Sequence, residues 1–218
     1  MRPLLPIGIV AFVGLVAIGS GVLLYRANKP QVLSISTAKA AAEKAEAVHA
    51  RGPANAAVTV EEFGDFQCPP CAALSEPLNQ LEQDYHNKVR LIFRNFPLAN
   101  HQYAHPAAFA AEAAGLQGRF WEMHDLIYRE QATWSKSANP SELFLSYAKI
   151  VGLDTEKFQK DIDSEEVKQR VATDQKHAAE LGVRLTPTIF VNGKSVTGPS
   201  LTPNGLHAAI DAALKETP

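Results

Sequence analysis

Phe66-Gln67-Cys68-Pro69-Pro70-Cys71 carries both cysteines of this 218-residue chain. The β-branched and aromatic run Val58–Phe63 before it predicts a strand. Apolar residues at helical spacing after it predict a helix over residues 68–82. Two cysteines separated by two residues, at the junction of a strand and a helix, are the context of a redox-active pair. The stretch therefore predicts the start of an α/β fold and its chemical centre together.

The spacing suits a dithiol in which one sulfur reacts and the other resolves. Cys68 is expected at the helix N-cap, because the partial positive charge and the free N–H groups of the helix end stabilise a thiolate there. It is also expected to be exposed, because the reacting sulfur must be reached by a substrate. Cys71, one turn later, is expected to be the buried resolving thiol. Pro69 and Pro70 fit the first helical positions, where a missing backbone N–H costs little.

Two other interpretations of the cysteine pair stay open. One is half of a zinc site, but a structural zinc usually takes four ligands, and the sequence has no second cysteine pair. The other is an inert pair. We favour the redox-active disulfide and expect no metal site and no cofactor.

The N-terminal part of the chain predicts a membrane attachment. After a short segment, residues 1–6, residues 7–25 form a run without a charge that is long enough to cross a bilayer as a helix. Arg26 and Lys29 close it. We expect a transmembrane signal anchor, and a cleaved signal peptide is the alternative because Ala17-Ile18-Gly19 resembles a cleavage site. Residues 26–51 are expected to be a linker with a helical middle, Thr37–Ala50.

The rest of the chain predicts a mixed sheet with a long helical insertion. Val89–Phe96 is expected to be a second strand, parallel to the first because a helix joins them. Strands are next expected at Thr188–Asn192 and Ser195–Thr197, joined by a turn at Asn192-Gly193, and a helix at Leu201–Lys215 ends the chain. Between the second and third strands the sequence predicts helices at Ala104–Leu116, Phe120–Arg129, Ser141–Val151, Thr155–Ile162 and Glu165–Leu181. Asn139 and Glu142 are placed as the capping box of the third of these.

This order resembles the thioredoxin fold, and the inserted helices resemble specifically the DsbA-like thiol-disulfide oxidoreductases. The resemblance covers about residues 52–215 and rests on the cysteine stretch, on His105-Pro106 through Asp125, and on Gly182 through Gly193. It implies a DsbA-like thioredoxin domain over residues 52–218, in which residues 98–187 form the helical insertion and the cis-proline loop.

The resemblance also implies roles for three residues besides the cysteines. Pro187 would be the cis-proline that faces them, and Thr186 would present its backbone to a bound substrate chain. Glu62 would be a buried acid that exchanges a proton with Cys71. The alternative for Pro187 is an ordinary trans-proline at the start of a strand, and the alternative for Glu62 is a solvated strand glutamate. The catalytic set is then Cys68, Cys71, Pro187 and Glu62.

Four further side chains receive no catalytic role from the sequence. His101 and His105 have a spacing that could bind metal on a helix, but no acidic or cysteine ligand accompanies them, and His105-Pro106 is typical of a helix start. Trp121 and His124 are expected to be core and helix-surface residues of the insertion. The net charge of −2 gives no sign of nucleic-acid binding.

We therefore expect a membrane-anchored oxidoreductase that introduces or exchanges disulfides in exported proteins with free thiols. By the resemblance, a quinone-linked membrane partner would reoxidise it. The catalytic domain would lie on the periplasmic side of the cytoplasmic membrane. A reductase or isomerase kept reduced by a membrane donor is one alternative, and a metallochaperone is another.

Overall fold

The computed structural model describes residues 49–216, and residues 1–48 and 217–218 lie outside this description. The expected membrane span, residues 7–25, and most of the expected helical linker fall in the part that is not described. Within residues 49–216, no helix is long and apolar enough to cross a membrane.

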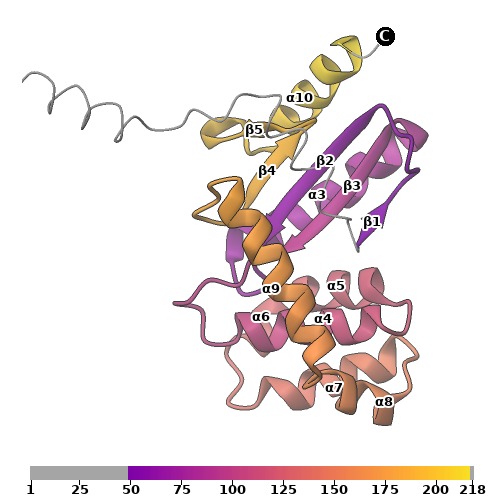
Figure 1. Cartoon of the computed structure of the whole chain (residues 1–218), viewed down its shortest axis with the longest axis vertical. Helices are drawn as coiled ribbons and strands as arrows, with labels where there is room; N and C mark the ends of the chain where they lie inside the picture. Colours follow the sequence, from indigo (N-terminus) through magenta and orange to yellow (C-terminus); the bar gives the residue numbers. More distant parts are fainter. Residues whose placement is uncertain (1–48, 217–218) are drawn as a thin grey trace, which may run out of the picture. The chain divides into compact units, whose positions relative to one another are not determined.

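A five-stranded mixed sheet in the order β1-β3-β2-β4-β5 forms the centre of the fold (Figure 1). β2 (Val58–Gly64) and β3 (Val89–Asn95) run parallel in its middle, as the sequence predicts. β4 (Thr188–Val191) pairs antiparallel with β2, and β5 (Lys194–Val196) pairs antiparallel with β4. The turn between them is the expected one, since Asn192 and Gly193 have φ angles of 47° and 74°.

The edge strand β1 (Ala50–Arg51) corrects the expected linker. The sequence predicts residues 49–51 as the end of the linker, with His49 and Ala50 in its helical part. Ala50 and Arg51 instead pair antiparallel with Ile92 and Leu91 of β3. The Arg51 side chain donates to Asn79 Oδ1 and Asp125 Oδ2, each at 2.7 Å. Long-range side-chain contacts thus hold a segment whose composition favours a helix.

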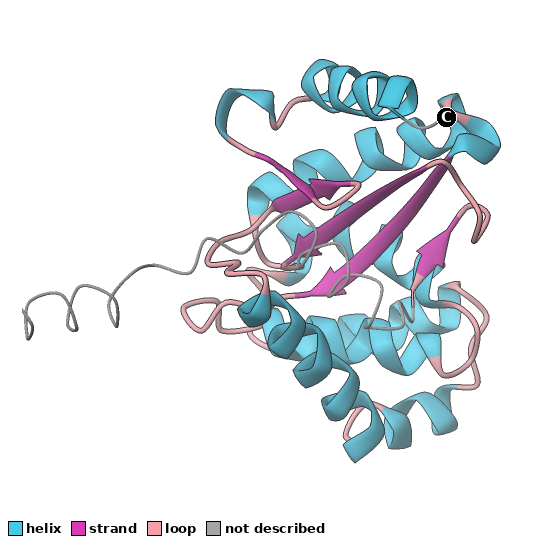
Figure 2. Cartoon of the chain, turned by 45° about the horizontal axis from the view of Figure 1, so that its top comes forward, coloured by secondary structure: helices cyan, strands magenta, loops and turns pink. Residues whose placement is uncertain are grey.

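Two helices cover one face of the sheet, α3 (Pro69–Asp84) and α10 (Pro203–Glu216). Their apolar side chains share a core with Val58, Val60 and Leu91 of the central strands. The opposite face carries the long helix α9 (Glu165–Glu180), which runs from the sheet to the inserted helices (Figures 1 and 2). Two short 3₁₀ turns, His86–Lys88 and Gly198–Ser200, connect elements of this part.

The insertion consists of helices packed at the end of the sheet where β2 and β3 finish (Figure 1). They are α4 (Ala104–Gly115), α5 (Phe120–Arg129), α6 (Gln131–Trp134), α7 (Pro140–Ile150) and α8 (Thr155–Asp161). The sequence predicts all of them except the single turn α6. Their buried residues form one core with Phe66, Phe93, Cys68 and Cys71, so the insertion covers the cysteine pair.

The expected capping box at α7 is absent. Asn139 is the N-cap residue, but its side chain accepts no hydrogen bond from the first turn. Its Nδ2 donates instead to Glu142 Oε1 at 2.8 Å. Side-chain caps occur at α8, where Asp154 accepts from two backbone N–H groups, and at α9, where Ser164 accepts from one.

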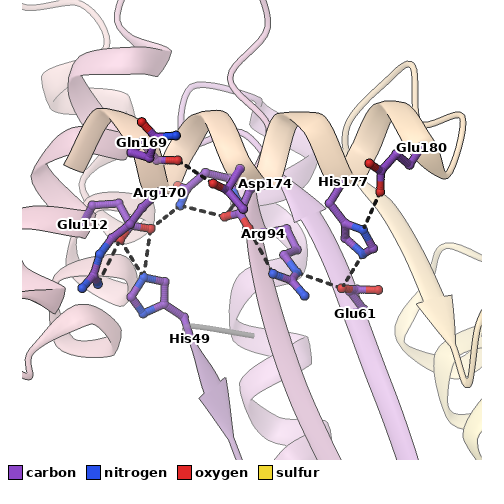
Figure 3. Close-up of polar contacts among 11 residues, drawn as sticks. His49, Glu61, Arg94, Glu112, Gln169, Arg170, Asp174, His177 and Glu180 are labelled. Carbon is purple, nitrogen blue, oxygen red and sulfur yellow. Dashed lines mark hydrogen bonds and ion pairs between the residues drawn. The ribbon is translucent and has the colours of Figure 1, made fainter. Parts of the chain in front are cut away.

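A buried polar cluster joins the insertion to the sheet (Figure 3). Arg94 Nε donates to Glu61 Oε1 at 2.8 Å, and Arg94 Nη1 donates to Asp174 Oδ1 at 3.2 Å. Glu112 of α4 accepts from Asn95 Nδ2 at 2.7 Å and contacts His49 Nε2 at 2.9 Å. Such groups stay buried only when they are paired, so the cluster fixes how α4 and α9 sit on β3.

Candidate active site

Cys68 begins the active-site helix. It is the N-cap residue of α3, with φ −78° and ψ 116°, and Pro69 and Pro70 follow at the first helical positions. Its carbonyl accepts the first helical hydrogen bond, from the Ala72 N–H at 3.2 Å. The predicted position at the helix N-terminus is confirmed.

The predicted exposure of Cys68 is wrong. Cys68 is 4% exposed and Cys71 is fully buried. The Cys68 thiol donates to the Thr186 carbonyl at 3.5 Å, so the loop before β4 covers the sulfur. Pro69 and Pro70 are exposed, which leaves Cys68 just beneath the surface and Cys71 behind it.

The two thiols, both free in this structure, differ in acidity. A hydrogen bond with Cys71 lowers the pKa of Cys68 to about 6, against its burial and the negative charge of Asp65. Burial raises the pKa of Cys71 far above its usual value, and the hydrogen bond to Cys68 and the charge of Glu62 act in the same direction. At neutral pH the pair therefore consists of one thiolate and one thiol.

Glu62 lies under the cysteines, as the resemblance implies. Its side chain is 2% exposed, and it pairs in the sheet with Phe93 and Ile189, which are also buried. Burial raises the pKa of Glu62 to about 8, with a further contribution from Cys68. Its Oε1 is a buried oxygen without a hydrogen-bond partner. The carboxyl group is therefore neutral near pH 7 and has an oxygen free to exchange a proton.

The loop before β4 meets the cysteine pair. The Thr186-Pro187 peptide bond is cis, as the resemblance implies, and Pro187 is buried. The pairing of β4 with β2 begins only at Thr188, opposite Phe63. Thr186 therefore lies outside the ladder, with its carbonyl next to Cys68.

Asp65 is a site residue that the sequence did not single out. It is 1% exposed, its Oδ1 accepts from the Gln67 N–H at 2.7 Å, and its Oδ2 accepts from the Leu98 N–H at 2.9 Å. The same Oδ2 contacts His101 Nδ1 at 2.7 Å. Asp65 thus ties the loop before Cys68 to the loop after β3. The local contact with the Gln67 N–H is typical of an Asx turn, which a sequence can indicate. The contacts with Leu98 and His101 join residues that are 33 and 36 positions apart, which a local pattern does not indicate.

Gly64 and Tyr128 form the floor of the site on the side of the insertion. A Cβ on Gly64 would lie 2.5 Å from the Phe93 ring and 2.8 Å from the Tyr128 hydroxyl, so only glycine fits there. The Tyr128 hydroxyl is buried without a hydrogen-bond partner. Burial raises the pKa of Tyr128 well above its usual value, and Cys71 and Glu62 add to the shift. No sequence pattern indicates this contact.

The remaining predicted side chains have structural partners. His105 lies in the first turn of α4 against Phe109. Trp121 is partly buried under the Arg51 guanidinium, which lies 4.4 Å from the ring centroid. His124 is 2% exposed and not on the helix surface, because it lies on the face of α5 that contacts the rings of Phe66 and Phe93. Among residues 49–216, no group of three or more His, Cys, Asp or Glu side chains could hold a metal ion.

Comparison with known proteins identifies the family. The sequence model of the family described as Thioredoxin matches residues 44–212. A solved thioredoxin-like oxidoreductase from Silicibacter pomeroyi is 31% identical, with a TM-score of 0.64 over 77% of this chain and 92% of that one. The thiol-disulfide exchange protein alpha-DsbA2 from Wolbachia pipientis shares the fold at 21% identity, with a TM-score of 0.68 over 84% of this chain and 99% of that one.

A further relative is much longer than this chain. The Na(+)/H(+) antiporter NhaA 1 of Salinispora arenicola is 41% identical over 170 residues, which are 78% of this chain and 25% of the antiporter. The chain thus spans about a quarter of this curated relative. The family match and the 31%-identical thioredoxin-like oxidoreductase give the classification: the chain belongs to the thioredoxin family, and it shares the fold of the solved alpha-DsbA2.

Proposed function

We propose that the protein donates the Cys68–Cys71 disulfide to exported proteins that carry free thiols. The observation that carries this proposal is the unequal acidity of the pair. The pKa of Cys68 is lowered to about 6 at the start of α3, and the pKa of Cys71 is raised by burial. A thiol that is stable as a thiolate is a good leaving group in disulfide exchange. The reduced form of the pair is therefore favoured, and the disulfide is readily transferred to a substrate with two thiols.

The exchange proceeds in two steps. A substrate thiolate attacks Cys68 Sγ, a substrate–Cys68 disulfide forms, the Cys68–Cys71 bond breaks, and Cys71 leaves with the electron pair. A second substrate thiolate then attacks the substrate sulfur of the mixed disulfide, and Cys68 leaves as a thiolate. The substrate loses two electrons and gains a disulfide, and the pair gains both electrons.

Glu62 supplies the proton that Cys71 needs in this scheme. The Cys71 thiolate is costly because it is buried, so it must be protonated as it forms. The carboxyl group of Glu62, with a pKa raised to about 8, is neutral and can donate. In the reverse direction the Glu62 carboxylate takes the proton back.

Thr186 and Pro187 would hold the substrate chain beside Cys68. The Thr186 carbonyl lies 3.5 Å from Cys68 Sγ, and Thr186 precedes the first paired residue of β4. An extended peptide can pair with such backbone groups and place its own cysteine at Cys68. Pro69 and Pro70, both exposed, would form the opposite wall.

The proposal includes the division of the chain and its place in the cell. Residues 7–25 would anchor the protein in the cytoplasmic membrane, residues before β1 would connect it, and the domain that begins with β1 would be catalytic and lie outside the membrane. Disulfide formation belongs to an oxidising compartment, which supports this orientation. A quinone-linked membrane protein would reoxidise the pair. The proposal does not include ion transport, which is named only for the much longer Na(+)/H(+) antiporter relative.

One observation favours a second candidate, a reductase or isomerase. Pro70, directly before Cys71, places no positive charge near the Cys68 thiolate. The thiolate is then stabilised less than in a strongly oxidising pair, and a membrane donor could keep it reduced.

The test uses the full chain with its disulfide formed and reduced, unfolded ribonuclease as substrate. We expect ribonuclease activity to appear with loss of the protein's disulfide, and Cys71→Ala to accumulate a mixed disulfide through Cys68. Assays of insulin reduction and of scrambled ribonuclease reactivation distinguish the second candidate. Failure to oxidise ribonuclease, together with rapid reduction of insulin, would overturn disulfide donation.

A further inference from the structure

One side chain of the insertion holds the backbone on both sides of Gln67. Gln131 Nε2 donates to the Phe66 carbonyl at 2.7 Å and to the Cys68 carbonyl at 3.0 Å. Gln131 is the first residue of α6 and is partly buried. The mechanism above gives it no role, and no sequence pattern pointed to it.

The chemistry of the amide fits these two partners. A glutamine NH₂ group has two N–H donors, and here each has a carbonyl acceptor. The oxygen end of the amide could not take this place, because it would face two other oxygens. The contact therefore sets both the orientation of the amide and the spacing of the two carbonyls.

The turn that carries Gln131 is firmly held. Trp134, the last residue of α6, is fully buried, and its Nε1 donates to the Ile127 carbonyl at 2.7 Å. Its ring packs against Phe144 of α7 at a centroid distance of 5.3 Å. The position of Gln131 is thus fixed by the core of the insertion.

The two carbonyls lie next to the reactive sulfur along the chain. A carbonyl oxygen carries partial negative charge, and one of the two belongs to Cys68 itself. An N–H group directed at each oxygen offsets that charge, which favours a negative sulfur nearby. It also holds Cys68 in the N-cap conformation at the start of α3, where Cys71 carries the first backbone N–H that can face the sulfur because Pro69 and Pro70 have none.

We propose that Gln131 is a positioning residue for Cys68: its amide, held by the insertion, fixes the Phe66 and Cys68 carbonyls and favours the ionised form of Cys68. The proposal rests on Cys68 being the reactive thiol. It gives the insertion a part in the chemistry besides covering the site.

The test compares variants of Gln131 in the full, reduced chain. Gln131→Met keeps the approximate shape without a donor, Gln131→Glu replaces the donors with a negative acceptor, and Gln131→Lys keeps a donor and adds a positive charge. Thiolate absorbance near 240 nm is followed against pH. We expect the pKa of Cys68 to rise by about 0.5 to 1 unit in Gln131→Met, to rise further in Gln131→Glu, and to stay the same or fall in Gln131→Lys.

Gln117→Met is the matched control. Gln117 is also a partly buried glutamine of the insertion, and its side chain bonds to both backbone groups of Asp154, at 3.1 and 3.0 Å. Its loss should lower the unfolding temperature of the disulfide form without moving the Cys68 titration.

Three outcomes would overturn the proposal: Met and Glu variants of Gln131 that titrate like the parent, Glu and Lys variants that shift in the same direction, or a Gln117→Met variant that shifts as much. A parent protein that reacts at Cys71 instead would contradict the proposed function itself. The two failures are therefore distinguishable.

Discussion

Two cysteines of identical chemistry behave differently here because a single helical turn separates them. Cys68 caps the helix and contacts the Thr186 carbonyl, whereas Cys71 is buried above Glu62. The hydrogen bond between them favours the charge on Cys68 and disfavours it on Cys71. The asymmetry that the exchange needs thus arises from local geometry and burial.

Glu62 gives a prediction for the pH dependence of stability. Its folded pKa of about 8 lies above its usual value of 4.5, mainly through burial. Because the pKa is raised on folding, the contribution of Glu62 to the stability of the folded protein is fully present below about pH 4.5. This contribution is lost as the pH rises through about 8. In the disulfide form, where no thiol titrates, we expect Glu62→Gln to match the parent near pH 4.5 and to be more stable at pH 8.5, by an amount on the order of several kcal/mol.

Urea unfolding of both proteins in the disulfide form across this pH range measures the difference. Glu76→Gln is the control, because Glu76 is an exposed residue of α3. Parallel stability curves for the parent and Glu62→Gln would show that folding does not raise the pKa of Glu62.

At the scale of elements, sequence patterns found what local composition decides. The central strands, α3, the longer helices of the insertion and the Asn192-Gly193 turn follow from apolar spacing and turn residues. The patterns missed β1 and α6, which are two and four residues long. Both are held by contacts with distant parts of the chain, so no local pattern could reveal them.

The residues of the candidate site also fall into two groups, those that the sequence indicates and those that only the fold brings together. The cysteine pair lies in a recognisable motif, and the roles of Pro187 and Glu62 follow from the resemblance to the DsbA-like family. Asp65, Tyr128 and Gln131 act through partners between 33 and 65 residues away or through close packing, which only the folded chain shows. Local sequence does not show the burial of Cys68, because the loop that covers its sulfur comes from Thr186, far along the chain.

The strand β1 leads to a prediction about the element itself. Arg51 donates to Asn79 and Asp125 and lies over Trp121, and it thereby connects β1 to α3 and α5. We expect Arg51→Ala to lower the free energy of unfolding by about 1 to 3 kcal/mol, because two hydrogen bonds of a charged donor are lost.

Lys194→Ala is the matched control for Arg51→Ala. Lys194 also pairs with a carboxylate, Glu216, but both side chains are more than half exposed. Its loss should cost at most about 1 kcal/mol. Equal unfolding midpoints for the two variants in urea would mean that β1 contributes nothing through Arg51.

At the scale of the whole molecule, the redox pair lies where three parts meet. The sheet, α3 and the insertion contribute to one apolar core that includes Cys68, Cys71, Phe66 and Phe93. The buried polar cluster between β3, α4 and α9 holds the insertion in place (Figure 3). The insertion can therefore shape both access to Cys68 and the acidity of its thiol.

The proposed topology predicts where a C-terminal reporter works. Alkaline phosphatase fused after Pro218 should be active, because it needs an oxidising compartment, and a fluorescent protein that folds only in the cytosol should be dark. Resistance of the fusion to carbonate extraction should accompany this if residues 7–25 anchor the chain. A bright cytosolic reporter would contradict the orientation.

The most direct test of the central claim is the alkylation of the reduced full chain by iodoacetamide as a function of pH, with each cysteine quantified by peptide mapping. The account predicts that Cys68 is labelled with a rate that rises through pH about 6, and that Cys71 stays unlabelled in the folded protein. Equal labelling of both cysteines, or a Cys68 rate that rises only near pH ~8.5 as for an unperturbed thiol, would contradict it.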